Sequence, residues 1–385
     1  MQDQESAGYR HTAAEIASQP SVWQKTLTVV QGALPALSDF CEGAERLVLT
    51  GAGSSYYAAV SMMPLLRRSF SSVDAIPSTE ILMDPGSCFP RGEFVLVSIA
   101  RSGNSPEGNA VFMLAEELRP GDVRHLVITC NPEGELSRLA ERRGSRAFRL
   151  LLPEESNDKG LAMTASFTSL TIAGFSLAFL EAPPAYASVV NGLCRAARQI
   201  LDVGGDLASA ESDKGYSRMF FLGTRPFLGG AMEAHLKVQE LSGGTVVAAA
   251  EDTLGFRHGF MAAVDADSLI ALFLSRDPHR RRYELDLLKE LHDKRLGRKS
   301  IVVCDGREGL GQAPSDGPPR REVIDYGPAP GVTDEVRAPL LAVTGQLFGL
   351  FFSLRAGLHP DNPSPSGIIA RIVQGVRIYP YGARE

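Results

Sequence analysis

Three charged residues recur at helical spacing between positions 233 and 240. Glu233, Lys237 and Glu240 lie at i, i+4 and i+7, so a helix through this stretch places all three on one face. Gly243 and Gly244 then end the helix. On a solvated helix such a face is an ordinary stripe of ion pairs. If the face is buried, Glu240 is a candidate general base that Lys237 and Glu233 tune.

A second candidate for proton transfer is His258, which lies between Arg257 and Gly259 in a predicted turn. Imidazole titrates near neutral pH, so His258 could move a proton, although a single histidine in a loop more often has only a structural role. The histidines and the five cysteines show none of the spacings of a metal site, and we predict no metal.

The stretch after the apolar run Phe94–Ile99 offers groups that bind anions. It contains Arg101, Ser102 and Ser105, and a helix is predicted to follow from Pro106 to about Leu118. The free N–H groups of a helix N-terminus, together with two hydroxyls and a guanidinium, can hold a phosphate. The alternative is a capped turn without a ligand, in which Ser105 is the N-cap.

An earlier glycine-rich turn, Gly51-Ala-Gly-Ser-Ser, also follows an apolar run. It begins like a dinucleotide-binding fingerprint, but Tyr56 replaces the third glycine and no acidic residue ends the next predicted strand, so we reject nucleotide binding. The glycines still allow a sugar or phosphate to approach the backbone, and Ser54 and Ser55 offer hydroxyls.

Composition excludes several classes of partner. The 385 residues carry a formal net charge of −6, which gives no electrostatic reason to expect binding to nucleic acid or to an anionic membrane. The cysteines lie far apart without a CxxC pair, and the N-terminus lacks the pattern of a signal peptide, so a reducing cytoplasm is expected. The most apolar stretch, Leu161–Leu180, carries several hydroxyl residues and is predicted to be a buried helix.

The elements that must position these residues alternate between strand and helix and then repeat. Apolar runs at 46–50, 94–99 and 126–130 are echoed in order about 175 residues later, at 218–222, 269–274 and 301–305. This pattern predicts a tandem duplication of one α/β domain with a parallel, doubly covered sheet. Residues 1 to about 40 are predicted to be helical with an interruption at Pro20, and Gly306–Pro319 a surface loop.

Together these stretches resemble the sugar isomerase (SIS) domain family. The resemblance is to its galactosamine-6-phosphate deaminase/isomerase branch, long described as tagatose-6-phosphate ketose/aldose isomerase. The segments that carry it are Glu15–Ile16 with Gln19–Trp23, Arg101–Glu107, Ala162–Ser166, Gly255–Gly259 and Ile372–Val376. It implies two tandem doubly wound parallel-sheet SIS domains, at 41–190 and 191–357, with a helical N-terminal arm at 1–40 and a C-terminal tail at 358–385 that lies over the site.

The resemblance also implies a phosphate loop at positions 100–105. In the related glucosamine-6-phosphate synthase isomerase domain this loop reads Ser-Gln-Ser-Gly-x-Thr, and here it reads Ala-Arg-Ser-Gly-Asn-Ser. The hydroxyls at Ser102 and Ser105 are kept, one hydroxyl is lost at Ala100, and an amide is replaced by Arg101. Arg101 therefore either binds phosphate or makes a subunit contact.

Further roles are implied by the same resemblance. Glu240 matches the base that moves a proton between C1 and C2, and His258 matches a ring-opening histidine donated by a neighbouring subunit. Lys237 and Glu233 line the same pocket. The remaining implied substrate contacts are Ser54, Ser55 and Arg371, the last at the position of a lysine that covers the sugar.

The implied reaction converts an amino-hexose 6-phosphate, galactosamine 6-phosphate, to tagatose 6-phosphate and ammonia without a cofactor. A cytoplasmic homodimer or higher homo-oligomer with shared active sites is expected. Three alternatives stay open: an aldose–ketose isomerase without deamination, a glucosamine-6-phosphate deaminase, and a non-catalytic sugar-phosphate-binding regulator.

Overall fold

The computed structural model describes residues 8–312, 317–364, 366–371, 373 and 375–382. Parts of the predicted arm, surface loop and tail lie outside the described residues, namely 1–7, 313–316, Pro365, Ile372, Gln374 and 383–385. The chain forms two compact units, each assembled from three segments. Unit 1 comprises Met1–Ser21, Asp158–Thr164 and Ser188–Pro363, and unit 2 comprises Val22–Asn157, Ala165–Ala187 and Ser364–Glu385.

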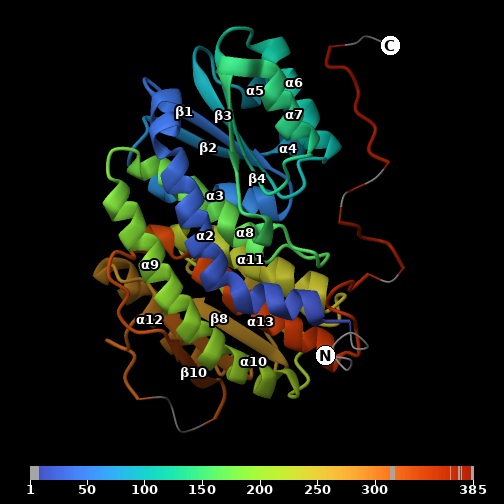
Figure 1. Ribbon diagram of the computed structural model, residues 1–385. Helices are drawn as coiled ribbons and strands as arrows, with labels where there is room; N and C mark the ends of the chain where they lie inside the picture. Colours follow the sequence, from blue (N-terminus) through green and yellow to red (C-terminus); the bar gives the residue numbers. More distant parts are fainter. Residues whose placement is uncertain (1–7, 313–316, 365, 372, 374, 383–385) are drawn as a thin grey trace. The chain divides into compact units, whose positions relative to one another are not determined.

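Unit 2 contains a parallel sheet of five strands in the order β2-β1-β3-β4-β5. The strands are β1 (Arg46–Gly51), β2 (Ser72–Pro77), β3 (Phe94–Ala100), β4 (Val123–Thr129) and β5 (Ala147–Leu151). One face packs against α3 (Ser54–Leu66) and α8 (Ala165–Phe175), and the other against α4 (Ser78–Met83), α6 (Pro106–Leu118) and α7 (Glu135–Arg143) (Figure 1). The short helix α5 (Pro85–Cys88) precedes β3. As predicted, α8 is buried along its whole length.

Unit 1 contains a second parallel sheet of five strands, in the order β10-β9-β8-β6-β7. Its strands are β6 (Arg218–Leu222), β7 (Val247–Glu251), β8 (Ser268–Phe273), β9 (Lys299–Cys304) and β10 (Arg320–Asp325). The order repeats that of the first sheet, which confirms the predicted pair of doubly wound domains. The strands β7 and β10 were not predicted. Both are partly exposed edge strands; β10 has no continuous apolar run, and the run of β7 is mostly alanine, which has a low strand propensity.

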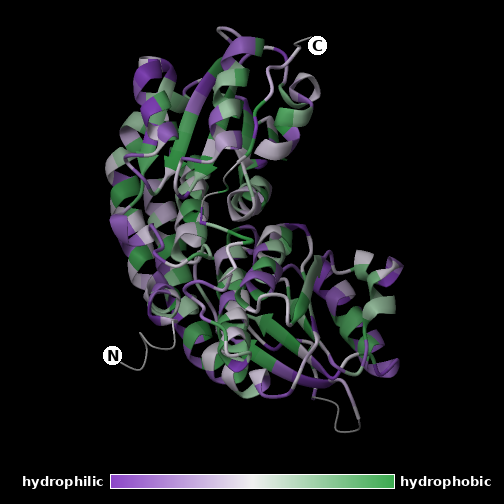
Figure 2. Cartoon of the chain, turned by 90° about the vertical axis from the view of Figure 1, so that its right-hand side faces the viewer, coloured by the Kyte–Doolittle hydropathy of each residue, from purple (hydrophilic) through white to green (hydrophobic). Residues whose placement is uncertain are grey.

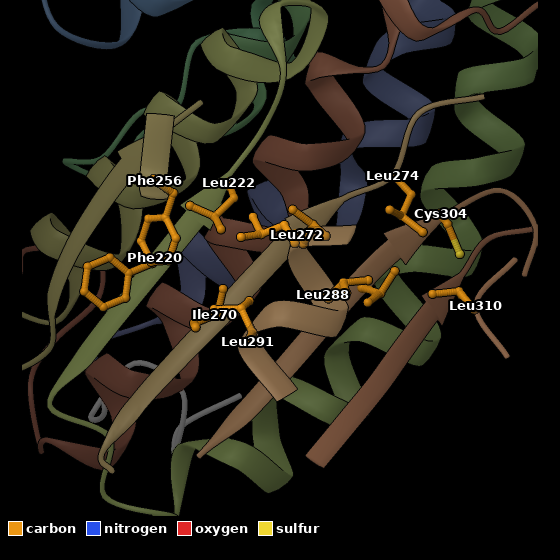
Figure 3. Packing of buried hydrophobic residues seen from close by; sticks show 12 residues of the cluster. Phe220, Leu222, Phe256, Ile270, Leu272, Leu274, Leu288, Leu291, Cys304 and Leu310 are labelled. Atoms are coloured by element: carbon orange, nitrogen blue, oxygen red, sulfur yellow. The ribbon is translucent and has the colours of Figure 1, made fainter. Parts of the chain in front are cut away.

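Helices cover both faces of the second sheet. They are α9 (Pro183–Gln199), α10 (Gly205–Ser212), α11 (Arg225–Leu241), α12 (Pro278–Asp293) and α13 (Ala338–Arg355). Leucines of α12 pack on β6, β8 and β9 in the buried cluster that Figure 3 shows. Helix α11 contacts β6 and β7 and packs along α13. Figure 2 shows the strands of each sheet coloured mainly as hydrophobic, as expected for sheets covered on both faces.

The glycines that end β1 and β6 have the same physical role. A Cβ on Gly51 would lie 2.6 Å from the Cβ of Ser55, and one on Gly223 would lie 2.8 Å from the Cβ of Phe227. In each sheet the strand therefore turns into the next helix with no room for a side chain. The repeated glycine reflects close backbone packing at equivalent turns.

The predicted interruption at Pro20 is wrong, because α2 (Arg10–Cys41) is continuous. A proline at position 20 leaves the carbonyl of Ile16 without its helical N–H donor. The side-chain amide of Gln19 donates to that carbonyl at 3.0 Å, and it also donates to Gln346 Oε1 at 2.7 Å. A buried side chain thus replaces the missing backbone bond.

Among the described helices, α13 has a length and apolar composition that could span a membrane, but 83% of it is buried within the protein. It packs against α10 and α11, as a core helix does. All five cysteines lie in the described part of the chain, where they are buried and form no disulfide.

Candidate active site

Helix α11 buries the three charged residues that the sequence places on one of its faces. The side chains of Glu233 and Lys237 are 0% and 1% exposed, and that of Glu240 is 24% exposed. Lys237 Nζ lies 2.5 Å from Glu240 Oε2 and 3.3 Å from Glu233 Oε1. The face is therefore an interior cluster of two carboxylates and one ammonium, and not a solvated stripe of ion pairs.

The lysine of this cluster is held in its charged form. Burial alone would lower the pKa of Lys237, but the charges of Glu233 and Glu240 outweigh burial and hold that pKa above its usual value. Of the two carboxylates, Glu240 is partly exposed, whereas Glu233 is fully buried. Glu240 is thus the carboxylate of the cluster that solvent can reach, and Lys237 fixes its position by donating a hydrogen bond to it.

Close packing with α13 holds this face in place. A Cβ on Gly349 would lie 2.6 Å from the carbonyl oxygen of Lys237, and one on Gly345 would lie 2.7 Å from that of Ala234. The two glycines let the helix backbones approach more closely than larger residues would allow. Backbone contact with an apolar helix therefore fixes the turns of α11 that carry Glu233 and Lys237.

His258 lies on a separate turn of unit 1. The turn, the short helix η5 (Gly255–His258), follows β7 and is held by Asp252, whose Oδ1 accepts from the backbone N–H of Gly255 at 2.9 Å. Phe256 is buried beside Phe220, with ring centroids 5.5 Å apart, as Figure 3 shows. The next two residues point outward: Arg257 Nε lies 2.6 Å from Glu290 Oε2, and His258 is exposed. An exposed imidazole on an anchored turn is available to a ligand or to another chain.

The loop after β3 is a capped helix N-terminus, as one of the two sequence interpretations predicted. Ser105 is the N-cap of α6, and its Oγ accepts from Gly108 N at 3.1 Å. Ser102 Oγ accepts from Asn104 N at 3.3 Å. Asn131 braces the loop by donating to the carbonyl oxygen of Ser102 at 2.7 Å. A capping role does not prevent a hydroxyl and the remaining helix N–H groups from receiving an anion.

Arg101 and Arg371 come together within unit 2. Arg101 is 6% exposed, and its Nη2 donates to the carbonyl oxygen of Arg371 at 3.3 Å. The exposed side chain of Arg371 donates to Asn157 Oδ1 at 2.8 Å. Arg101 thus binds the C-terminal segment of its own chain.

Ser54 and Ser55 lie beside this loop. Both are buried at the start of α3, directly after β1. Strands β1 and β3 are neighbours, and the chain leaves them toward opposite sides of the sheet. Such a point, at the carboxyl ends of the strands, is where open α/β sheets bind ligands.

One polar cluster of unit 1 was missed by the sequence analysis. Glu15 Oε1 accepts from the backbone N–H groups of Lys159, at 2.5 Å, and Gly160, at 3.2 Å. Burial, and then the charges of Asp158 and Asp361, raise the pKa of Glu15 to about 7. The helical period places Glu15 next to a buried position, but no local signal shows that residues 158–160 reach it.

Comparison with known proteins connects the chain to phosphosugar enzymes, although no family model matches it. A Streptomyces coelicolor protein provisionally named D-galactosamine-6-phosphate deaminase AgaS is 41% identical over 381 residues, covering 96% of this chain and 95% of that protein. The D-galactosamine-6-phosphate deaminase AgaS of Escherichia coli O157:H7 is 34% identical, covering 97% and 96%.

A solved structure of a Clostridium novyi protein, provisionally described as tagatose-6-phosphate ketose/aldose isomerase, superposes with a TM-score of 0.91 at 32% identity. The match covers 99% of this chain and 98% of that one. The chain therefore belongs to the galactosamine-6-phosphate deaminase branch of the sugar isomerase (SIS) domain family.

Proposed function

We propose that the protein converts galactosamine 6-phosphate to tagatose 6-phosphate and ammonia. The single observation that carries the proposal is the interior cluster of α11, in which Lys237 holds a partly exposed Glu240. A regulator that only binds a sugar phosphate has no need of such a carboxylate. The names of the relatives that match over nearly the full chain support the same reaction and substrate.

In this proposal the loop after β3 binds the phosphate. The hydroxyls of Ser102 and Ser105 and the N-terminus of α6 are its ligands, and Ser54 and Ser55 contact the sugar. Binding of this non-reacting group holds the sugar in one orientation. Arg371 covers the sugar, while Arg101 fixes the segment that carries Arg371.

The chemistry is a proton transfer followed by hydrolysis. His258 promotes opening of the sugar ring. Glu240 removes the proton from C2 of the open aldehyde and returns a proton to C1, which leaves an imine at C2. Water hydrolyses the imine and releases ammonia, and a ketone remains at C2. The carbonyl group accepts the electrons during this sequence, so the proposed reaction uses no cofactor and no metal.

We also propose a cellular location and an oligomeric state for the enzyme. A cytoplasmic location is supported by five buried cysteines that form no disulfide among the described residues. A homo-oligomer with shared active sites is supported by the exposed position of His258, because a ring-opening histidine donated by a neighbouring subunit must reach out of its own chain.

The test is release of ammonia from galactosamine 6-phosphate and glucosamine 6-phosphate, measured side by side with ketose formation. We expect Glu240→Gln to lower kcat by about 10²–10⁴-fold, because the amide cannot accept the C2 proton, and to leave substrate affinity largely unchanged. Glu322→Gln is the matched control, since Glu322 is a half-exposed carboxylate on β10.

Ammonia release by Glu240→Gln at the wild-type rate would contradict the assignment of the base. Ketose formed without ammonia would favour the isomerase named in the solved structure. A preference for glucosamine 6-phosphate would identify that sugar phosphate as the substrate in place of galactosamine 6-phosphate.

A separate prediction concerns the phosphate loop. Ser102→Ala removes a proposed hydroxyl ligand, and we expect KM to rise roughly 10-fold with a smaller change in kcat, since the phosphate does not react. Isothermal titration with the substrate checks the affinity. Ser87→Ala, at an exposed serine of α5, should bind as the wild type does. Unchanged affinity in Ser102→Ala would remove Ser102 from the site.

A further inference from the structure

The second sheet repeats the architecture of the proposed phosphate loop. Strand β8 is followed by residues 274–277 and then by α12, whose N-cap is Asp277 and whose first residue is Pro278. Asp277 accepts from Arg280 N at 2.9 Å, as Ser105 does from Gly108 N in the first sheet. Strands β6 and β8 are neighbours that the chain leaves toward opposite sides, so this loop also lies where α/β sheets bind ligands.

A carboxylate of the same chain occupies this position. Asp334 Oδ1 and Oδ2 accept from the backbone N–H of Arg276, at 2.9 and 3.2 Å, and Oδ2 also accepts from Asp277 N at 3.3 Å. Arg280 Nη2 donates to Oδ2 at 2.7 Å, and Arg337 Nη1 donates to Oδ1 at 2.7 Å. Two backbone N–H groups and two guanidinium groups therefore surround one carboxylate, as they would a bound anion.

The buried guanidinium of Arg337 favours a negative charge at the position of the Asp334 carboxylate. Its side chain is 0% exposed and lies between the rings of Phe227, at 4.9 Å, and Tyr326, at 5.4 Å. Its Nε and Nη2 make no hydrogen bond among the described residues. The other carboxylate near it is Asp305, whose Oδ1 is 4.0 Å away and whose Oδ2 already pairs with Arg276 Nε at 2.6 Å.

The carboxyl group of Asp334 is held as an anion. Burial would raise its pKa, but the N–H of Arg276 and the guanidinium groups of Arg337 and Arg280 outweigh burial and keep that pKa below its usual value. A buried guanidinium without such a partner would be strongly destabilising.

We infer that residues 276–280 and Arg337 form a second oxyanion-binding seat, which Asp334 fills as a built-in ligand. The ligand class that the seat takes is a small oxyanion, a carboxylate or a phosphate. This seat is closed to solutes because the chain supplies its own carboxylate. The inference rests on the contacts of Asp334 and is independent of the reaction proposed above.

The test uses the full-length protein with the substitution Asp334→Ala, which removes the carboxylate that fills the seat. The thermal midpoint should fall by roughly 5 °C or more, because Arg337 loses its closest carboxylate. Sodium formate or inorganic phosphate, at ionic strength matched with sodium chloride, should then raise the midpoint of the variant by about 2–4 °C more than that of the wild type. Recovery with formate alone, with phosphate alone or with both supports the seat and defines the size of its ligand.

Two variants serve as controls. Asp334→Asn fills the seat without charge, so it should be destabilised but not recover with either anion. Glu211→Ala removes another buried carboxylate, one that pairs with Lys299 at 2.6 Å and lies near the C-terminal end of its helix, α10. The inference is overturned if neither anion selectively stabilises Asp334→Ala, or if Glu211→Ala recovers equally.

A variant that does not fold on expression still gives an answer. Asp334→Ala is then refolded from urea in formate, phosphate or chloride. A yield of folded protein that rises only with the oxyanions supports the seat, and equal yields in all three salts overturn it.

Discussion

Charged side chains that unit 1 shields from solvent, fully or in part, differ in what surrounds them. Lys237 lies between two carboxylates, and Asp334 lies between two guanidinium groups. Glu15 instead lies near two further carboxylates, Asp158 and Asp361, and its hydrogen bonds come from backbone N–H groups. Its protonated form is therefore favoured in the folded protein.

This difference predicts a pH dependence of stability. The pKa of Glu15 rises from 4.5 to about 7 on folding, so the folded protein binds more protons than the unfolded chain between these values. Stability must then fall as pH rises through this range. Glu15→Gln mimics the protonated acid. In this variant the part of the stability loss that comes from Glu15 should be absent when urea midpoints are measured from pH 5 to pH 8.

A carboxylate elsewhere provides the comparison. Glu155 is half exposed, and the hydrogen bond from Lys25 lowers its pKa, so it is ionised throughout that range. Glu155→Gln should therefore show the same change of urea midpoint with pH as the wild type. If the urea midpoint of Glu15→Gln also changes with pH as that of the wild type does, Glu15 is not the group responsible for the pH dependence.

Among the helices, the pair α11 and α13 decides where the candidate base lies. Their contact depends on glycines of α13 that meet the backbone of α11 at Ala234 and Lys237. Because the obstruction to a larger residue is backbone, it cannot be relieved by a change of rotamer. The position of Lys237, and with it that of Glu240, is thus coupled to the surface of a helix more than 90 residues later in the chain.

Gly349→Ala should therefore impair both stability and activity. Overpacking of this kind costs about 1–3 kcal/mol, and we expect a lower unfolding midpoint together with a lower kcat as α11 shifts. Gly32→Ala, in the exposed part of α2 where a Cβ meets nothing within 4 Å, should be neutral or slightly stabilising. A wild-type kcat in Gly349→Ala would show that α13 does not position the base.

At the scale of the whole molecule, the question is whether Glu240 and His258 of the same chain act in one active site. The cluster of α11 is interior, whereas His258 is exposed on its own turn. Shared sites in a symmetric oligomer would bring such a histidine from the neighbouring chain.

Mixing two inactive variants tests this arrangement. We expect His258→Ala and Glu240→Gln to be inactive alone and to regain activity after joint unfolding and refolding, to about a quarter of the wild-type level in a randomly assorted dimer. Sedimentation equilibrium gives the oligomeric state. A mixture that stays inactive although mixed oligomers form would place both residues in one chain's site.

Local signals in the sequence were sufficient for the duplicated α/β architecture. The central strands of both sheets are continuous apolar runs because they are buried on both faces, and α6 begins at Pro106 as its N-cap predicts. The spacing of Glu233, Lys237 and Glu240 likewise fixes that they share a face of one helix. The edge strands give a weaker signal, because β10 has no continuous apolar run and the run of β7 is mostly alanine.

Only the tertiary structure decided whether that face is buried, where Arg101 binds and what fills the second seat. Each outcome depends on residues distant in sequence: α13 against α11, Arg371 against Arg101, and Asp334 against residues 276–280. Helical and strand periods describe only which neighbours share a face. Which surfaces then meet is set by close packing and by the need of every buried charge for a partner, and both arise only when the whole chain is folded.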